Sequence, residues 1–305
     1  MTTLSSITVS VPATTANLGP GFDCLGAAIS LYNRFKFSIA DSPIEVKITV
    51  TGKEAPRVST DRNNLAYQAF VKLYEYINQT PPCVLIEIDL GVPLARGLGS
   101  SATAIVGGLL GANQLAGSPL SQTEVMNLAI AIEGHPDNVV PALLGGCRLT
   151  ASTSKGWVVC DIPWHPDIVP VVAIPDFELS TTEARRVIPT EYIRSDAIFN
   201  CAHLGILLRG LETGYGEWLQ AGMQDKIHQP YRKSLIKGYE YVRSAALNAG
   251  AYEMVISGAG PTLLALTNSL TSAKVIAAMT SAWENQGVVT QVQALEINTR
   301  GAVFS

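Results

Sequence analysis

The first third of the chain is dominated by apolar residues that alternate with polar ones, as they do in β-strands. This pattern covers residues 4–50 and is interrupted over residues 17–23. Alternation with a period of two places the apolar side chains on one face of a sheet. Between Asp61 and Tyr76 the apolar positions instead recur about every 3.6 residues, which predicts a helix. The apolar, β-branched run at residues 84–90 then predicts a further strand.

Two more helices are predicted in the middle of the chain. Residues 101–116 are rich in Ala, Leu, Ile and Gly and contain no proline, so they predict the first of these helices. The second begins after Ser121, because Ser121 and Glu124 have the spacing of a capping box. It ends near Glu133, because Gly134 is typical of the position that follows a helix.

A proline-containing segment at residues 162–167 marks the expected domain boundary, since proline interrupts both helices and strands. The chain has 305 residues, more than one hydrophobic core usually supports. We therefore expect an N-terminal domain over residues 1–163 and a C-terminal domain over residues 164–305. In the second domain the pattern predicts strands at 168–174, a pair of strands on either side of residues 258–261, and a strand at 287–297. It also predicts helices at about 196–211, 232–249 and 272–285. This arrangement of strands and helices predicts an α+β fold.

The overall charge argues against several classes of partner. The chain has 21 basic and 25 acidic residues and a net charge of −4, whereas binding to nucleic acid or to a membrane surface calls for a basic face. No apolar run reaches the ~18 residues of a membrane span, and the first basic residue, Arg34, comes too late for a targeting segment. The five cysteines are scattered and form no C-x-x-C pair, which indicates a reducing compartment. We expect a cytoplasmic protein, and a homodimer is left open.

The segment Pro93–Thr103 carries the strongest functional signal in the chain. It joins the predicted strand at 84–90 to the predicted helix at 101–116, and it reads Pro-Leu-Ala-Arg-Gly-Leu-Gly-Ser-Ser-Ala-Thr. Gly97 and Gly99 can adopt positive φ, which allows a ligand to approach the backbone closely. The first amides of a helix lack partners within the helix and lie at the positive end of its dipole, so this segment predicts a phosphate site. A glycine turn capped by serine, without any ligand, is the alternative.

Two other phosphate-binding motifs fit this segment less well. A Walker A loop requires a lysine, which is absent here. The glycines also satisfy the relaxed dinucleotide pattern G-x-G-x-x-A. That pattern requires a second strand and an acidic residue roughly 20 positions further on. At that distance this chain has a turn followed by the capping box at Ser121.

Together with two other segments, this loop resembles the motifs of the GHMP kinases. Val11–Asp23 reads Val-Pro-Ala-Thr-Thr-Ala-Asn-Leu-Gly-Pro-Gly-Phe-Asp, similar to the first motif in the homoserine kinase branch, and Ser257–Thr262 reads Ser-Gly-Ala-Gly-Pro-Thr and resembles the third. The resemblance implies an N-terminal domain like the second domain of ribosomal protein S5 and a ferredoxin-like C-terminal domain. It also implies transfer of the γ-phosphoryl group of MgATP to the side-chain hydroxyl of L-homoserine, on the route to threonine.

The resemblance implies roles for individual residues on the nucleotide side. It implies that Asn63 contacts the adenine side of ATP and that the glycine loop binds the rest of the nucleotide. The loop residues are Pro93, Leu94, Ala95, Arg96, Gly97, Leu98, Gly99, Ser100, Ser101, Ala102 and Thr103. Ser101 and Glu133 match the pair that holds Mg²⁺, an ion that binds a few protein oxygens together with phosphate oxygens and water. Glu133 lies at a predicted helix C-terminus, where the dipole disfavours a carboxylate by roughly 0.3–1 kcal/mol unless a cation is near. A solvated surface glutamate is the alternative.

On the substrate side, the resemblance implies carboxylates for an ammonium group and arginines for a carboxylate. Asp23 and Asp137 match the former, and Arg185 and Arg232 are expected to grip the α-carboxylate bidentately. A Pro-containing short loop is expected to carry three of the pocket residues. The full implied set is Asn17, Asp23, His135, Asp137, Asn138, Thr181, Arg185, Arg232 and Gly260.

The implied catalytic residues are Asp137 and Asn138, with Asn138 and Asn17 near the reacting hydroxyl. Residues 11–33 contain no lysine, which argues against the Lys/Asp base pair of sibling kinases. Taken without the resemblance, Asp137 and Asn138 form an ordinary helix cap, and each arginine is a solvated surface residue. Two other functions remain open: a GHMP kinase for another small alcohol, such as mevalonate or a sugar, and a catalytically inactive relative that senses a ligand.

Overall fold

The part of the chain that the structure describes forms two β-sheets. The computed structural model describes residues 5–40 and 45–305, so the parts of the predicted strand region at residues 4 and 41–44 lie outside the described residues. The first sheet has seven strands, with the order β11-β1-β2-β4-β3 and a hairpin, β5–β6, attached to β2. These strands are β1 (Ser6–Ala16), β2 (Leu25–Ile39), β3 (Val46–Thr51), β4 (Val84–Leu90), β5 (Cys147–Thr153), β6 (Gly156–Ile162) and β11 (Val303–Phe304).

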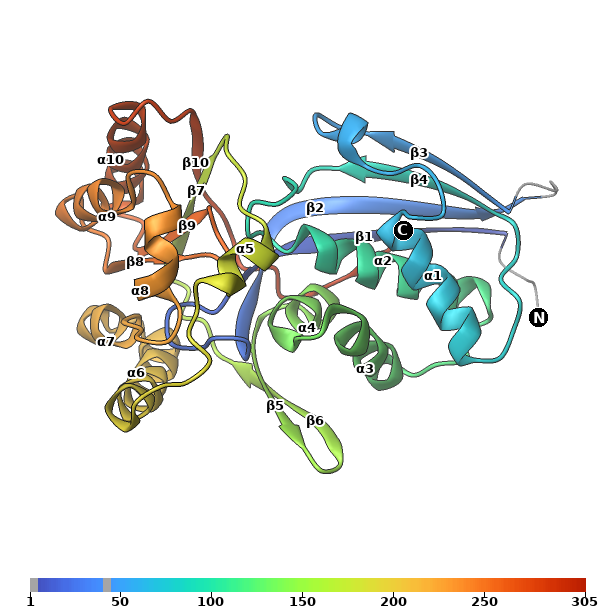
Figure 1. Ribbon diagram of the computed structural model, residues 1–305, viewed down its shortest axis with the longest axis horizontal. Helices are drawn as coiled ribbons and strands as arrows, with labels where there is room; N and C mark the ends of the chain where they lie inside the picture. Colours follow the sequence, from blue (N-terminus) through green and yellow to red (C-terminus); the bar gives the residue numbers. More distant parts are fainter. Residues whose placement is uncertain (1–4, 41–44) are drawn as a thin grey trace.

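Four helices lie on one face of this sheet (Figure 1): α1 (Leu65–Tyr76), α2 (Ser100–Leu115), α3 (Gln122–Glu133) and α4 (Pro136–Leu144). Their apolar faces bury the core of the first domain, in which Phe35 and Phe37 of β2 lie under α2. Gly107 and Gly111 of α2 allow this close approach, because a Cβ atom on either would lie 2.5 or 2.3 Å from a phenyl ring carbon.

The second sheet has four antiparallel strands in the order β10-β7-β9-β8. Its strands are β7 (Val169–Pro175), β8 (Glu253–Ile256), β9 (Leu263–Thr267) and β10 (Thr290–Ala294). The accompanying helices are α5 (Thr181–Arg186), α6 (Arg194–Thr213), α7 (Gly216–Gly222), α8 (Gln229–Arg232), α9 (Tyr239–Asn248) and α10 (Ser272–Glu284). Because the first and third strands are central and helices follow β7 and β9, the topology is ferredoxin-like, as the family resemblance implied.

The two sheets share a hydrophobic core where they meet. Ala27 and Ile29 of β2 belong to the same buried cluster as Val172 of β7, Leu264 of β9 and Leu207 of α6. The predicted boundary segment lies between β6 and β7. The end of the chain, however, returns to the first sheet, where β11 pairs with β1, although these residues fall within the predicted second domain. Only two residues of β11 pair with β1, and they lie far from β1 in the sequence, so no local sequence pattern predicts this pairing.

Most predicted elements are present, with differences in their bounds. The helix predicted from Asp61 begins at Leu65, because Asn64 caps it by accepting hydrogen bonds from the amides of Ala66 and Tyr67. The helix predicted over 232–249 is two helices, α8 and α9, separated by a short 3-10 turn and by Gly238, whose φ is +76°. None of the helices formed by the described residues is long and apolar enough to cross a membrane.

The expectation of a short loop at residues 135–138 was wrong, because these residues open helix α4. Pro136 is the first helical residue, where its fixed φ suits the helix and its missing amide hydrogen is not needed. Pro141 lies inside the same helix. Because proline is typical of loops, these two prolines led the sequence pattern to predict a loop instead of a helix. The helix lies close to β2, since a Cβ atom on Gly26 would come within 1.8 Å of the Asp137 carbonyl oxygen.

Candidate active site

Three segments that lie far apart in the sequence are joined by hydrogen bonds where the two sheets meet. The Thr14 amide in β1 donates to the carbonyl of Leu98 in the glycine loop over 3.1 Å. The Ser257 hydroxyl, just after β8, donates to the carbonyl of Gly97 over 2.7 Å. The ends of β1 and β8 therefore hold the glycine loop in place from both sides.

Both glycines of the loop adopt the predicted positive φ, +72° at Gly97 and +67° at Gly99. Packing requires glycine at both positions as well. A Cβ atom on Gly97 would lie 2.3 Å from the carbonyl oxygen of Ser257, and one on Gly99 would lie 2.0 Å from Thr14 Oγ1. These glycines thus allow the backbone of the loop to pass between β1 and the segment that follows β8.

The glycine loop ends at the N-terminus of α2, a helix of 16 residues. Gly99 is the N-cap residue, and no side chain among the described residues caps this end of the helix. The amides of Ser100 and Ser101 therefore begin a long helix whose positive end carries no side-chain acceptor. An oxyanion such as a phosphate group is the ligand that suits this arrangement.

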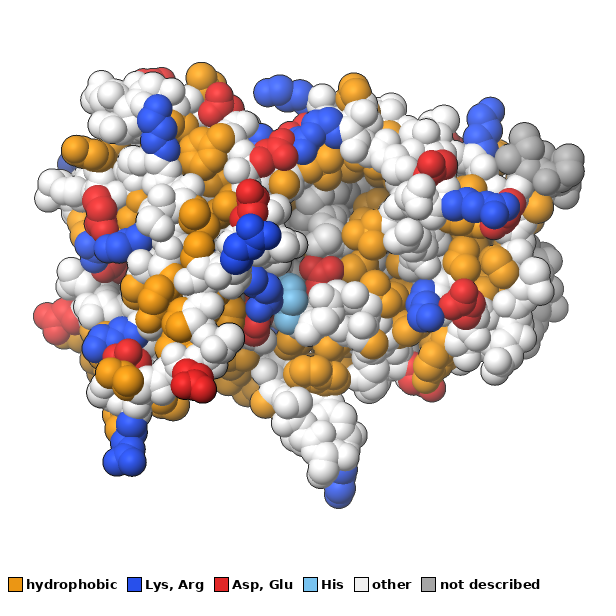
Figure 2. Space-filling model, in the orientation of Figure 1, with side chains coloured by type: hydrophobic (Ala, Val, Ile, Leu, Met, Phe, Trp, Pro, Cys, Tyr) orange, Lys and Arg blue, Asp and Glu red, His pale blue; other side chains and the backbone are white. Residues whose placement is uncertain are grey.

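A cavity of about 280 Å³ opens beside this helix end, between the two domains. Figure 2 shows the hollow between the two halves of the molecule, with acidic, basic and histidine side chains gathered beside it. The loop residues that line the cavity are Ala95, Arg96, Gly97, Gly99, Ser100 and Ser101. The other side chains around it are Asn17, Asp23, Glu133, His135, Asp137, Asn138, Leu179, Ser180, Thr181, Arg185, Arg232 and Ala259, together with Gly258.

Ser101 and Glu133 lie next to each other at the cavity wall, and the Ser101 hydroxyl donates to Glu133 Oε1 over 2.8 Å. Burial at the end of α3 raises the pKa of Glu133, while the hydrogen bond from Ser101 and the nearby His135 act in the opposite direction. Oxygens that are adjacent ligands of an octahedral Mg²⁺ lie about 2.9 Å apart, given metal–oxygen distances of 2.0–2.1 Å. The separation and the donor types of this pair therefore fit Mg²⁺.

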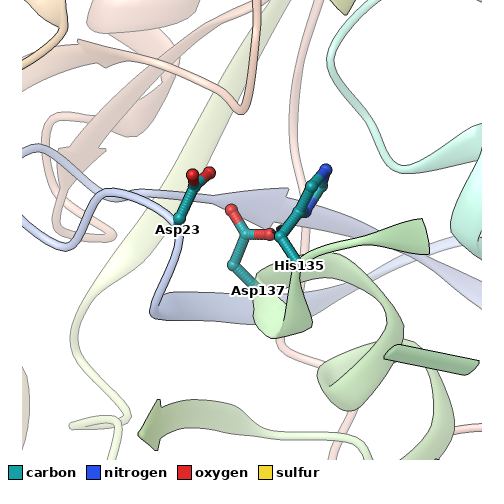
Figure 3. A group of neighbouring side chains, drawn as sticks. All are labelled: Asp23, His135 and Asp137. Carbon is teal, nitrogen blue, oxygen red and sulfur yellow. Dashed lines mark hydrogen bonds and ion pairs between the residues drawn. The ribbon is translucent and has the colours of Figure 1, made fainter. Parts of the chain in front are cut away.

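The start of α4 brings a histidine and a carboxylate to the cavity (Figure 3). His135 Nδ1 lies 2.6 Å from Asp137 Oδ1, and the Asp137 side chain is only 3% exposed. Burial lowers the pKa of His135, but the hydrogen bond and charge of Asp137, together with the charges of Glu133 and Asp23, outweigh it, so the net shift is upward. Asn138 is held alongside, because its Oδ1 accepts a hydrogen bond from Thr14 Oγ1 over 2.8 Å.

Asp23 faces this pair from the loop that follows β1. One ligand atom from each of Asp23, His135 and Asp137 lies within 4.8 Å of the others, and Figure 3 shows the two carboxylates next to each other with His135 beside Asp137. Asp23 is already paired with Arg185 of α5 by two hydrogen bonds, of 2.9 and 2.7 Å. The cavity is therefore lined by three carboxylates, Asp23, Glu133 and Asp137, and Asp23 is already paired with a guanidinium group.

Both the sequence and the fold of this chain are similar to those of known proteins. The model of the GHMP kinases N terminal domain matches residues 64–146, and that of the GHMP kinases C terminal domain matches residues 207–285. The homoserine kinase of Trichodesmium erythraeum (strain IMS101) is 98% identical over 305 residues, all of both chains. The homoserine kinase of Trichormus variabilis is 68% identical over 302 residues, 99% of this chain and 100% of its own. The chain belongs to the homoserine kinases of the GHMP superfamily.

Solved structures of this superfamily have the same fold. The crystal structure of a homoserine kinase from Cytophaga hutchinsonii matches with a TM-score of 0.90 at 30% identity, over 100% of this chain and 99% of that chain. The mevalonate kinase of L. major, in complex with R-mevalonate, matches with a TM-score of 0.71 at 15% identity and covers 95% of each chain, a likeness of fold alone. The two-domain α+β fold expected from the motifs is thereby confirmed. Membership of a kinase family also implies the use of ATP.

Within the glycine loop, several residues that were expected to bind ATP do not line the cavity. Leu98, Ala102 and Thr103 are buried in the protein. Arg96 does line the cavity, but its guanidinium group turns toward the second domain, where it donates to the carbonyls of Pro175 and Asp176 over 2.9 and 2.6 Å. These side chains support the loop, and a ligand would meet its backbone instead.

Pro93, Leu94 and Asn63 are also absent from the cavity wall. Asn63 is exposed, and its amide donates to the side chain of Asp61 over 2.8 Å in the turn before α1. Its assignment to the adenine side remains a prediction.

The residues expected to bind the substrate reach the cavity more consistently than those expected to bind ATP. All of them line the cavity except Gly260, and the neighbouring Gly258 and Ala259 line it instead. Sequence reasoning did not single out Thr14, which holds Asn138, although Thr14 lies within the first motif. The only signal for it was its place in that motif, because the hydrogen bond joins residues 124 positions apart.

Arg232 was expected to grip a carboxylate bidentately, and the structure does not allow this. Its Nε donates to the Ala184 carbonyl over 3.0 Å, and its Nη1 donates to the Gly258 carbonyl over 3.0 Å. Nη1 also lies 3.3 Å from Nδ1 of His228. Because both two-nitrogen edges of the guanidinium include Nε or Nη1, only Nη2 can donate to a ligand without breaking these bonds.

Proposed function

We propose that this chain transfers the γ-phosphoryl group of ATP to the side-chain hydroxyl of L-homoserine and so forms O-phospho-L-homoserine. One observation carries the proposal. A single cavity is lined both by the N-terminus of α2 and by two carboxylates and two arginines, Asp23, Asp137, Arg185 and Arg232. A phosphate donor and a zwitterionic acceptor can therefore meet in one space, as phosphoryl transfer requires.

The glycine loop and α2 are proposed to bind the triphosphate of ATP. The free end of α2 attracts the phosphate charge, and the backbone of Gly97 and Gly99 is close to the cavity. Ser101 and Glu133 would hold Mg²⁺. The ion, when bound, would offset the negative charge on the transferred group.

The acceptor end of the cavity suits an amino acid. Asp23 and Asp137 are proposed to bind the ammonium group of homoserine, and Arg185 and Arg232 its carboxylate. Without substrate, Asp23 and Arg185 satisfy each other through a 2.7 Å ion pair. A zwitterion carries the same two charges, so it can interact with both partners without leaving either one unpaired.

Asn17 and Asn138 are proposed to lie near the reacting hydroxyl. Asn138 is fixed on both sides, by Thr14 at 2.8 Å and by a bond from its Nδ2 to Asp137 Oδ1 at 3.3 Å. The Asn138 side chain can therefore orient the hydroxyl without changing its own conformation. Phosphoryl transfer depends chiefly on alignment and charge neutralisation, so orientation by Asn138 and Asp137 is a sufficient catalytic role for these residues.

The first prediction concerns the acceptor. Purified protein with MgATP should release ADP when L-homoserine is added, and the product should be O-phospho-L-homoserine by mass spectrometry. R-mevalonate and galactose should give at most background release, because neither carries the ammonium group that Asp23 and Asp137 would bind. Turnover of mevalonate or galactose in preference to homoserine would contradict the proposal, and absence of turnover with all three would favour an inactive ligand sensor.

The cytoplasmic location and the absence of a nucleic-acid partner stay predictions from the sequence. Whether the chain forms a homodimer stays open.

A further inference from the structure

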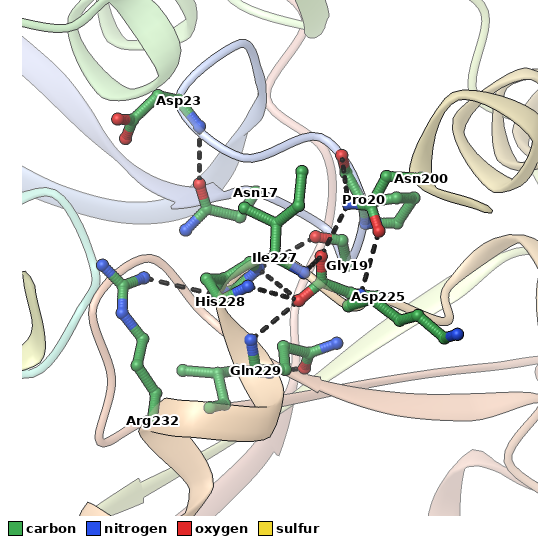
Figure 4. A network of polar contacts seen from close by, with 12 residues as sticks. Asn17, Gly19, Pro20, Asp23, Asn200, Asp225, Ile227, His228, Gln229 and Arg232 are labelled. Atoms are coloured by element: carbon green, nitrogen blue, oxygen red, sulfur yellow. Dashed lines mark hydrogen bonds and ion pairs between the residues drawn. The ribbon is translucent and has the colours of Figure 1, made fainter. Parts of the chain in front are cut away.

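A buried polar network joins the back of the cavity to α6 (Figure 4). At its centre is Asp225, whose side chain is 0% exposed. Asp225 Oδ1 accepts hydrogen bonds from the Ile227 amide at 2.9 Å and from Asn200 Nδ2 at 2.7 Å. Its Oδ2 accepts from the amides of His228 and Gln229 at 2.9 and 2.7 Å. Four donors thus fix this carboxylate, and with it the backbone from which α8 begins.

His228, the next residue in this network, is also fully buried. Its Nε2 lies 2.9 Å from the carbonyl oxygen of Gly19 in the first motif. A carbonyl oxygen can only accept, so Nε2 must carry a hydrogen. Burial lowers the pKa of His228, although the charge of Asp225 acts in the opposite direction. The imidazole is therefore neutral, and its Nδ1 is a hydrogen-bond acceptor.

The acceptor atom of His228 faces Arg232. Arg232 Nη1 lies 3.3 Å from His228 Nδ1 and 3.0 Å from the Gly258 carbonyl. Arg232 Nε is held by the Ala184 carbonyl at 3.0 Å. A guanidinium has five N–H groups, and these contacts use three of them. The two that remain are both on Nη2.

Phe22 completes the arrangement by stacking on His228. The two ring centroids are 5.2 Å apart, with an angle of 23° between the planes. The guanidinium carbons of Arg232 and Arg185 lie 5.2 and 5.5 Å from the Phe22 ring centroid. The phenyl ring therefore contacts the imidazole and both of the arginines proposed to bind the carboxylate.

We propose that His228 is a positioning residue that sets the rotation of the Arg232 guanidinium, so that Nη2 alone is presented to the α-carboxylate of the amino-acid substrate. Asp225 fixes His228 through the backbone, and the bond to Gly19 links the same imidazole to the loop that carries Asp23. This inference rests on the proposed function, because it concerns how that function recognises a carboxylate.

The test compares two variants at this position. His228→Phe keeps a ring against Phe22 but removes both the donor to Gly19 and the acceptor for Arg232. We expect the KM for homoserine to rise roughly 10- to 100-fold, because a buried donor and a buried acceptor lose their partners. The KM for ATP and kcat should change by less than threefold or so. His228→Gln carries one donor and one acceptor, as the neutral imidazole does, and should recover most of the lost affinity.

A control variant and a second substrate separate positioning from a general loss of structure. His203→Phe changes a half-buried histidine that packs on Phe199 in α6, away from the cavity, and should leave both KM values unchanged. With 3-aminopropan-1-ol, which lacks the carboxylate, His228→Phe should cost nothing further. An unchanged KM for homoserine in folded His228→Phe, or an equal rise in the KM for ATP, overturns the inference.

A measurement on the unmodified protein covers the case in which His228→Phe does not fold. A long-range proton–nitrogen NMR spectrum at neutral pH should show His228 as the neutral Nε2–H tautomer. A proton on Nδ1 would overturn the inference whether or not the protein is active. If the unmodified protein does not phosphorylate homoserine at all, the proposed function fails instead, so the two failures are distinguishable.

Discussion

Replacing Glu133 by Gln should lower kcat by roughly 100- to 1000-fold, the scale of losing one electrostatic contact to a reacting group. The amide keeps the shape of the side chain and can still accept the hydrogen bond that Ser101 now donates over 2.8 Å. It cannot supply the negative charge that attracts Mg²⁺. Initial rates measured against Mg²⁺ concentration should show a lower maximum and a higher Mg²⁺ requirement.

Glu75→Gln is the matched control, because Glu75 is an exposed glutamate on α1 that pairs with Lys72 on the protein surface. Its kinetics should equal those of the unmodified protein. Near-normal kcat of Glu133→Gln at saturating Mg²⁺ would remove Glu133 from the proposed metal pair.

Replacing Arg232 by Met should lower kcat/KM for homoserine by roughly 30- to several-thousand-fold, since breaking a buried charge pair costs about 2–5 kcal/mol. Arg232 is 2% exposed, and burial lowers its pKa to about 10, so it stays charged at neutral pH. A buried cation that lines the cavity suits an anionic group of a ligand. The measurement is steady-state kinetics with homoserine and with 3-aminopropan-1-ol.

The loss should be confined to the substrate that has a carboxylate. Methionine leaves the carbonyls of Ala184 and Gly258 without this donor, so thermal unfolding must be followed in parallel. Arg209→Met, a change at an exposed arginine of α6, is the control and should alter neither activity nor stability greatly. Equal losses with both substrates in a folded Arg232→Met variant would contradict a role in carboxylate recognition.

The parts of the site that were predicted well from the sequence are those specified by local chemistry. The strand, glycine loop and helix around Gly97 follow from residues within about twenty positions, and Gly97 and Gly99 have the positive φ expected of them. The capping box at Ser121 and the end of α3 before Gly134 were equally local, and both are present in the structure.

The parts that could not be predicted depend on partners far away in the sequence. Arg232 was assigned to a carboxylate, but its geometry is set by the carbonyl of Ala184 and by Gly258, 48 and 26 positions away. Asp23 was assigned to an ammonium group, yet its partner in the structure is Arg185, 162 positions along the chain. Helix α4 was missed for a local reason, since Pro136 and Pro141 are typical of loops as well as of helix starts.

The central claim is that one cavity beside the glycine loop recognises both charges of an amino acid. The most direct measurement is kcat/KM of the unmodified protein for L-homoserine and for 4-hydroxybutyrate, which lacks only the amino group. We predict that homoserine is preferred by roughly 30-fold or more, because without the ammonium group the carboxylates of Asp23 and Asp137 lose the partner proposed for them. Equal kcat/KM values for the two compounds would contradict the claim and would leave the carboxylates without a role in recognition.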